Sequence, residues 1–248
     1  MTHIQFTTPI CNETDLIDRF IPQNSLILML APVDAGITVV GTDILLHVAS
    51  GQPWIGRPVQ KGSVIGYGFD GSVCAELREG WKIHHSAEVP DTYLSKSELK
   101  LENSGCVERV CRDALAISEQ TGEPVRLIGI DAFSSRGPQE NFARGISTVV
   151  HHLEQIRIRT GAAVMLLSHK SYGDWTNSTL PGAPGAADVI LSLTRGGKLT
   201  NSNLRDEPIF LKFLTISLES EPSCSTTVVE GVRAENSLDV IATGKMVH

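Results

Sequence analysis

Short apolar runs recur along the chain and alternate with stretches of helical periodicity. The runs have the length of buried strands and cover Ser25–Leu30, Gly62–Asp70, Val125–Asp131, Ala162–His169 and Ala187–Leu193. A continuous apolar run of this length is typical of a strand that is buried on both faces, as in a parallel sheet. The pattern therefore predicts five strands of one central sheet.

Apolar residues at helical spacing predict the elements between these strands. The three predicted helices cover Thr38–Ser50, Val107–Ser118 and Phe142–Thr160. Gly51 follows the first helix as a C-cap, and Pro53 prevents its continuation. The pattern is weak over residues 72–105, where the polar stretch Asp91–Leu101 is predicted to be a loop, and Asp15–Phe20 is predicted to be a short helical turn.

The order of these elements indicates the fold class. Strands that alternate with helices form βαβ units and a mostly parallel sheet, with helices on its faces. After the fifth strand the pattern becomes one of strands alone, and Ile209–Leu218 and Thr226–Val232 predict a β hairpin or a pair of edge strands. Because the sequence shows no repeat and no strong linker, we predict one α/β domain with a C-terminal β extension.

Composition and charge narrow the class of protein. The 248 residues are 41% hydrophobic and 20% charged, which is the balance of a soluble globular protein. The net charge of −7 argues against a uniformly basic surface for nucleic acid. It leaves open a local basic patch, or a basic rim that forms when copies of the chain assemble.

Cysteines and terminal patterns indicate the compartment. The five cysteines are scattered without a CxxC pair, so we expect free thiols in a reducing cytosol: Cys11, Cys74, Cys106, Cys111 and Cys224. The first fifteen residues lack a basic segment followed by an apolar one, so we expect no signal peptide. Without an apolar run of about 18 residues, we expect a cytoplasmic protein with no membrane partner.

The groups of histidine and serine residues do not indicate a metal site or a serine hydrolase. His84–His85 and His151–His152 are adjacent pairs, and neighbours on a helix point to different faces, so neither pair is expected to share a metal ion. Ser134–Ser135 and Ser168–His169 lack the GxSxG elbow of serine hydrolases.

The loop between the first apolar run and the first helix is the candidate cofactor site. A strand, a tight loop and a helix are the setting of a phosphate-binding loop with the pattern GxxxxGK[ST]. Here the retained residues are Gly36, at the second glycine, and Thr38, at the hydroxyl position. Ala31 replaces the first glycine, and Ile37 replaces the lysine. The candidate cofactor-binding residues are Ala31, Pro32, Asp34, Ala35, Gly36, Ile37 and Thr38.

The missing lysine has a physical cost for phosphate binding. A charge-assisted contact of this kind contributes about 1.5–3 kcal/mol, and the loop lacks it. The Asp34 carboxylate adds a charge that repels phosphate. We therefore expect nucleotide binding to be weak or absent, and hydrolysis to be weaker still.

The segment after the loop carries a more specific resemblance. Thr42–Val59, which includes the run His47-Val48-Ala49-Ser50-Gly51 and the Trp54 turn, resembles the RepA-like AAA family of plasmid and phage replicative helicases, relatives of DnaB and KaiC. The resemblance covers most of residues 19–195. It implies a RecA-like three-layer domain over residues 19–248, with a mostly parallel central sheet and a C-terminal β extension, preceded by an N-terminal arm over residues 1–18.

The resemblance also implies site residues and cofactors. Asp131 matches the Walker B acid, Asp70 matches the glutamate that activates water, and His169 matches the polar residue that senses the γ-phosphate. The implied catalytic residues are therefore Asp70, Asp131 and His169, and the implied Mg²⁺ ligands are Thr38 and Asp131. ATP and Mg²⁺ are the implied cofactors, with the weak or absent binding expected from the loop.

Several departures from the family pattern concern hydrolysis. Asp70 is one methylene shorter than glutamate, and Pro184 stands where the family usually has an arginine. The late strand, which usually carries a basic pair that reaches into the neighbouring subunit, keeps only Lys212. Together with Ile37, these changes indicate relaxed selection on hydrolysis.

Three functions remain open at this point. The first is a degenerate RepA/DnaB-like protein of a mobile element, acting as a binding or regulatory subunit in DNA replication with weak or no ATP hydrolysis. The second is an active ATPase or hexameric DNA helicase in which Lys61 or Lys170 replaces the loop lysine. The third is a nucleotide-independent scaffold or transcription-control module. The expected partners are further copies of the chain, in a ring or other oligomer, and DNA or replication proteins.

Overall fold

A computed structural model describes most of the chain. The described residues are 13–69, 71–88, 91–131, 142–169, 187–201, 208–220 and 223–232. Asp70, Lys170 and Pro184 lie outside these ranges, as do Cys11 and the serine pair at 134–135. His169 is described only through its backbone.

One mixed sheet forms the centre of the molecule. Within the described residues its strands are β3 (Leu26–Ala31), β4 (Ser63–Tyr67), β5 (Tyr93–Ser95), β6 (Val125–Asp131), β7 (Ala163–His169), β8 (Val189–Leu193), β9 (Lys198–Asn201), β10 (Ile209–Ser217) and β11 (Ser225–Val232). Their order is β11-β10-β9-β8-β3-β7-β6-β4-β5. The pairs from β8 to β5 are parallel, and β9, β10 and β11 continue the sheet antiparallel. The predicted parallel sheet and C-terminal β extension are thus confirmed.

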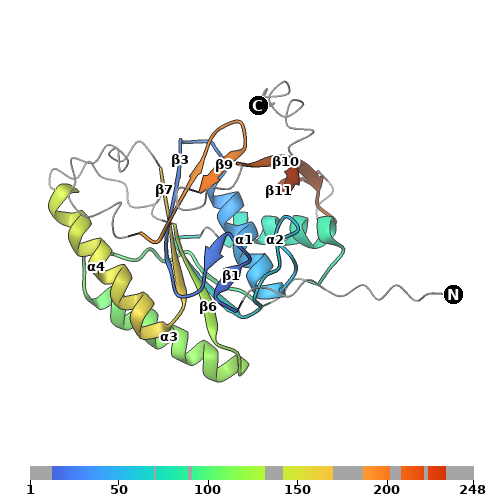
Figure 1. The fold of residues 1–248 in the computed structure, drawn as a ribbon. Helices are drawn as coiled ribbons and strands as arrows, with labels where there is room; N and C mark the ends of the chain where they lie inside the picture. Colours follow the sequence, from blue (N-terminus) through green and yellow to red (C-terminus); the bar gives the residue numbers. More distant parts are fainter. Residues whose placement is uncertain are drawn as a thin grey trace.

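Helices cover both faces of this sheet and complete three layers. Helices α1 (Ile37–Ser50) and α2 (Gly71–His85) pack on one face, and α3 (Gly105–Thr121) and α4 (Phe142–Thr160) pack on the other (Figure 1). Side chains alternate along β3, so that one set enters the core beneath α1 and the other set enters the core beneath α3 and α4. Because both faces are buried, the strand is apolar at every position.

Helix α1 lies in the interior and begins and ends at glycines. Gly36 has φ 80° at the start, and Gly51 has φ 76° at the end, where its N–H donates to the His47 carbonyl over 2.8 Å. A positive φ is accessible to glycine without the Cβ penalty that other residues have. Most side chains of the helix are buried, which fixes both the loop before it and the turn after it.

Two elements in the region of weak pattern were not predicted. Helix α2 buries Cys74, Leu77 and Trp81, which are spaced by three and four residues, while its other positions are mostly polar. Strand β5 lies within the stretch predicted to be a loop, and it pairs in parallel with β4. The loop prediction was wrong there because a three-residue edge strand is held by pairing with β4 and by two partly buried side chains, Tyr93 and Leu94, one on each core.

The N-terminal region also differs from its prediction. Asp15–Ile17 forms strand β1, which pairs with β2 (Ile21–Pro22), in place of the predicted helical turn. Leu16 and Ile17 are fully buried in the core beside α1. The arm predicted over residues 1–18 therefore includes residues that pack in the domain core.

The C-terminal hairpin covers part of the helical layer. Strand β11 lies against α2, and a Cβ on Gly80 would meet the Thr226 side chain at 2.2 Å. Val228 is buried at the same contact. The hairpin is therefore part of the packed domain.

Two further observations concern disulfide bonds and membrane-spanning helices. Within the described residues, Cys74, Cys106, Cys111 and Cys224 take part in no disulfide bond. In the same part of the chain, none of the helices combines the length and the apolar character needed to cross a bilayer.

Candidate functional site

The candidate loop lies at the carboxyl end of β3, between the ends of β7 and β8. This is the edge of an open parallel sheet where ligands bind in α/β proteins. Ala31 and Ala35 are buried, whereas Asp34 is exposed and has φ 64°. The loop is thus anchored at two alanines and carries its carboxylate toward solvent.

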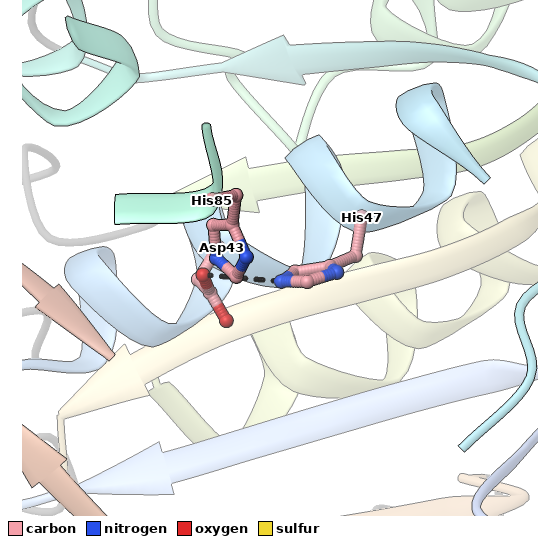
Figure 2. A group of neighbouring side chains, drawn as sticks. All are labelled: Asp43, His47 and His85. Carbon is pink, nitrogen blue, oxygen red and sulfur yellow. Dashed lines mark ion pairs between the residues drawn. The ribbon is translucent and has the colours of Figure 1, made fainter. Parts of the chain in front are cut away.

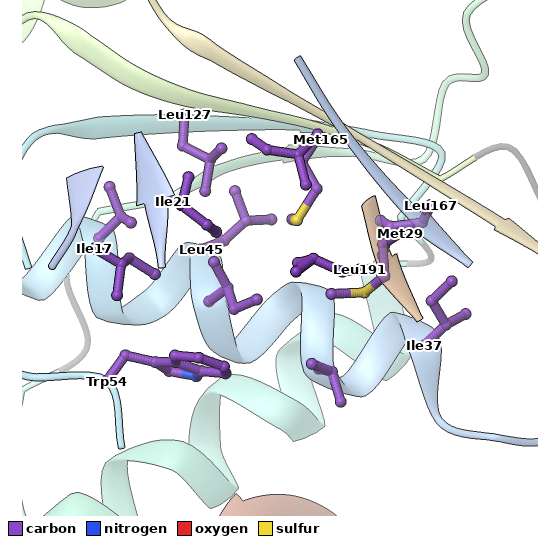
Figure 3. Packing of buried hydrophobic residues seen from close by; sticks show 14 of the residues in the cluster. Ile17, Ile21, Met29, Ile37, Leu45, Trp54, Leu127, Met165, Leu167 and Leu191 are labelled. Atoms are coloured by element: carbon purple, nitrogen blue, oxygen red, sulfur yellow. The ribbon is translucent and has the colours of Figure 1, made fainter. Parts of the chain in front are cut away.

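The side chain at the lysine position belongs to the core. Ile37 is 2% exposed, and it packs in the cluster that contains Met29, Leu167 and Leu191 (Figure 3). Its branched chain fills the space between the first turn of α1 and the sheet. Position 37 therefore supplies packing to the domain and no cation to the loop.

An aromatic ring lies against the loop glycine. A Cβ on Gly36 would be 2.9 Å from Cε1 of Phe213, a residue of β10. Neighbouring residues on a strand point to opposite faces of the sheet. Since Phe213 faces the loop, the neighbouring Lys212, which is exposed, points to the other face. The one basic residue retained in this late strand is directed away from the loop of its own chain.

The two predicted Mg²⁺ ligands lie together. The Thr38 hydroxyl, in the first turn of α1, donates to Oδ2 of Asp131, at the end of β6, over 2.7 Å. Asp131 is 6% exposed. A hydroxyl that donates one hydrogen bond still has lone pairs to offer. The pair therefore keeps oxygen ligands available at the carboxyl edge of the sheet.

A glycine holds the end of β4 beside Asp131. Gly68 has φ 81°, and a Cβ there would be 2.3 Å from the Asp131 carbonyl oxygen. No L side chain fits at that distance, so glycine lets the chain leave β4 close to Asp131. Asp70, the predicted catalytic residue two positions further on, lies outside the described residues, and the side chain of His169 is likewise not described.

Two basic residues, Lys61 and Arg195, are candidate substitutes for the loop lysine. Lys61 pairs with Glu123 over 3.5 Å and lies beside Gly51, at the end of α1 far from the loop. A 14-residue helix is about 21 Å long, so Lys61 cannot serve the loop. Arg195 does reach the loop, where its Nε–H donates to the Val33 carbonyl over 3.3 Å.

The two halves of the site differ in their fit to ATP and Mg²⁺. Thr38 and Asp131 are oxygen ligands of the kind that Mg²⁺ prefers. The phosphate half has a buried isoleucine in place of the lysine, a phenyl ring against its glycine and an exposed carboxylate at Asp34. The residues present thus fit the metal ion and do not fit a triphosphate.

The structure also brings together a polar cluster that the sequence analysis missed. Asp43 and His47 lie on the buried length of α1, and Trp54 Nε1–H donates to Oδ2 of Asp43 over 2.8 Å. Burial raises the pKa of Asp43 to about 7, although the Trp54 hydrogen bond opposes the shift. Burial, and then the nearby His85 ring, lowers the pKa of His47 to about 4. The signal in the sequence was the four-residue spacing of Asp43 and His47.

Comparisons with known proteins support the fold. A family model described as an AAA domain matches residues 3–174. A KaiC-like protein from the hyperthermophilic archaeon Pyrococcus horikoshii has a similar structure, with a TM-score of 0.51 and 11% sequence identity. The similarity covers 88% of this chain and 95% of that one. No curated protein matches the chain. The predicted RecA-like three-layer α/β architecture is confirmed.

Proposed function

Because the chain belongs to the AAA domain family, we propose that it keeps a P-loop NTPase fold while having lost normal ATP turnover. In this proposal it is a RepA/DnaB-like protein of a mobile element. It acts as a binding or regulatory subunit in DNA replication, with weak or no ATP hydrolysis. The resemblance of Thr42–Val59 to plasmid and phage replicative proteins supports the assignment to replication.

The burial of Ile37 carries the proposal. Family members use a lysine here to contact the terminal phosphates. At 2% exposure, the isoleucine contributes to the core, and the loop has lost a contact of about 1.5–3 kcal/mol. The exposed Asp34 adds repulsion in the same loop. Thr38 and Asp131 remain for packing and hydrogen bonding, and they keep the capacity to hold Mg²⁺.

Nucleotide binding by the pure protein is the direct test. Titration of a fluorescent ATP analogue with Mg²⁺ should give a Kd above about 10 µM, which corresponds to a binding free energy weaker than about −7 kcal/mol. Steady-state ATPase activity should stay at the background of a protein-free sample. Robust activity that Asp131→Ala abolishes, and that the exposed control Asp91→Ala retains, would refute the proposal.

One observation favours a second candidate, an active ATPase with an unorthodox site. Arg195 lies on the turn between β8 and β9 and contacts the Val33 carbonyl, so a permanent cation touches the loop. If it replaces the lysine, Arg195→Ala should remove nucleotide binding. Arg112→Ala, at a side chain 75% exposed on α3, should leave binding unchanged. Under the first proposal neither variant changes the weak binding.

The state of assembly distinguishes the proposal from the third function, a nucleotide-independent scaffold or transcription-control module. Self-association into a ring or other oligomer, with DNA or replication proteins as partners, is part of the proposal. Light scattering after size exclusion, with and without ATP, measures the assembly directly. A ring that forms equally in both conditions and binds no DNA at low salt would favour a scaffold or transcription-control module.

A further inference from the structure

A group of titratable side chains, two of them buried and one partly exposed, lies away from the candidate loop. Asp43 and His47 are one helical turn apart on α1, and His85 reaches them from the last residue of α2 (Figure 2). Each residue offers one ligand atom, and these three atoms lie within 4.8 Å of one another. A four-residue spacing places two ligands on the same face of a helix, which is a common arrangement for metal-binding pairs.

Hydrogen bonds orient the two residues of α1. Asp43 accepts from Trp54 through Oδ2, which leaves Oδ1 facing His47 Nε2 at 3.6 Å. The other ring nitrogen, Nδ1, lies 3.2 Å from the Gln52 carbonyl. A carbonyl oxygen can only accept, so Nδ1 carries the proton and Nε2 presents a lone pair. Outer partners of this kind, a carbonyl on histidine and a donor on the carboxylate, are typical of metal sites.

His85 brings a third donor atom without a protein partner. Its Nε2 is buried and has no hydrogen-bond partner among the described residues. The His85 and His47 rings meet edge to face, with centroids 4.8 Å apart. Neutral imidazole is the form of histidine that binds metal ions.

Without a cation this arrangement is unfavourable. The lone pair of His47 faces a carboxylate oxygen at 3.6 Å, which is too far for a direct hydrogen bond. The buried nitrogen of His85 has no partner in the described part of the chain, and such groups cost free energy unless they are paired. We propose that Asp43, His47 and His85 together bind one Zn²⁺ ion.

The donor set and the spacing both suit zinc. Zinc binds imidazole nitrogen and carboxylate oxygen. Bonds of about 2.1 Å in a tetrahedral site place the ligand atoms about 3.4 Å apart. The Asp43–His47 pair is already close to this distance at 3.6 Å. His85 is partly exposed at a helix end, so its ring can approach further.

A small pocket lies beside the carboxylate, and neither His47 nor His85 lines it. Asp43 lines it together with Thr42 and Trp81, and β11 closes its other side. Thr42 Oγ1 and Trp81 Nε1 are buried there without partners in the described part of the chain. A water in this pocket would bring a polar atom beside both groups.

The expected role of the ion is structural. Asp43 and His47 belong to the helix that follows the candidate loop, and His85 ends the helix that follows β4. One ion would therefore connect α1 to α2. Because the folded chain binds the ion and the unfolded chain does not present the site, zinc should raise the unfolding temperature.

Zinc binding can be measured on the full-length protein. The chain is treated with a chelator, dialysed and titrated with Zn²⁺, and bound metal is counted by mass spectrometry. Wild type should hold one zinc per chain, and a hundredfold excess over Kd should raise Tm by about 5–10 °C. His85→Gln should lose the bound zinc and the Tm rise, whereas the matched neighbour His84→Gln should keep both.

Each other outcome overturns the proposal. Wild type that binds no stoichiometric zinc contradicts it, as does His85→Gln that binds zinc like wild type. Loss of bound zinc in both histidine variants would place the metal on the adjacent residues His84 and His85, and would thus contradict the site. Asp43→Asn provides a second variant, because it keeps an acceptor for Trp54 and removes the carboxylate. Retention of zinc by this variant would also contradict the site. Metal-free unfolding curves show whether each variant folds.

Discussion

Replacing Ile37 with lysine should increase the affinity of the loop for ATP. The substitution restores the cation at the position where phosphate loops use one. Ile37 is 2% exposed, so the new side chain must leave the core and extend toward the loop. Lysine can do so because its aliphatic stem packs on apolar surface while its ammonium group reaches solvent.

The structure sets the size of both effects. A charge-assisted contact to phosphate of about 1.5–3 kcal/mol corresponds to about 10–150-fold tighter binding. The exposed Asp34 opposes this by about 1 kcal/mol at solvent-like dielectric, so the lysine outweighs it. Loss of the buried isoleucine should cost the domain about 1–3 kcal/mol of unfolding free energy.

Titration of a fluorescent ATP analogue with Mg²⁺ measures the gain, and thermal unfolding measures the cost. Ile37→Met is the matched control, because it has an unbranched chain of similar length without the charge. We expect Ile37→Lys to bind at least tenfold more tightly than Ile37→Met, by the charge-assisted contact described above. Equal affinity in the two variants, or tight binding by wild type, would refute the reasoning.

Two further predictions concern the surroundings of the site. Thr38→Val should lower the free energy of unfolding in denaturant by about 1.5–3 kcal/mol, because Asp131 loses a hydrogen bond. Thr42→Val should be neutral or stabilising in the metal-free protein, because the Thr42 hydroxyl is buried without a described partner. A cost at Thr42 as large as at Thr38 would contradict this difference. Gly68→Ala should destabilise by several kcal/mol more than Gly56→Ala, because both have positive φ but only Gly68 faces a backbone oxygen at 2.3 Å. Equal unfolding midpoints for the two alanine variants would show that no clash exists.

The parts of the fold that could be predicted from sequence are those buried on both sides. Strands β3, β6 and β7 are apolar at nearly every position because helices cover both faces, so their patterns stood out. Helix α2 touches the core through Cys74, Leu77 and Trp81, and its other positions are mostly polar, so its signal was weak. Strand β5 depends on pairing with β4, which no local pattern encodes.

In the candidate site, too, local features could be predicted from the sequence and contacts between distant residues could not. The loop and its substitution by Ile37 are local features, and the sequence was enough to identify them. The contact of Phe213 with Gly36 joins residues far apart in the chain, so it required the fold. The cluster of Asp43, His47 and His85 joins residues of two helices, so no local pattern of neighbouring residues indicates it. The partner of His85 lies on another helix.

The position of β8 beside β3 has a practical consequence. The family match stops at residue 174, before β8 begins. A shortened protein that ended there would leave one side of the most apolar strand open, with its amides and carbonyls available to any other extended chain. Such a fragment should precipitate during expression, whereas a version that extends through Val232 should remain in solution. Recombinant work on this protein therefore needs a longer segment than the homology boundary suggests.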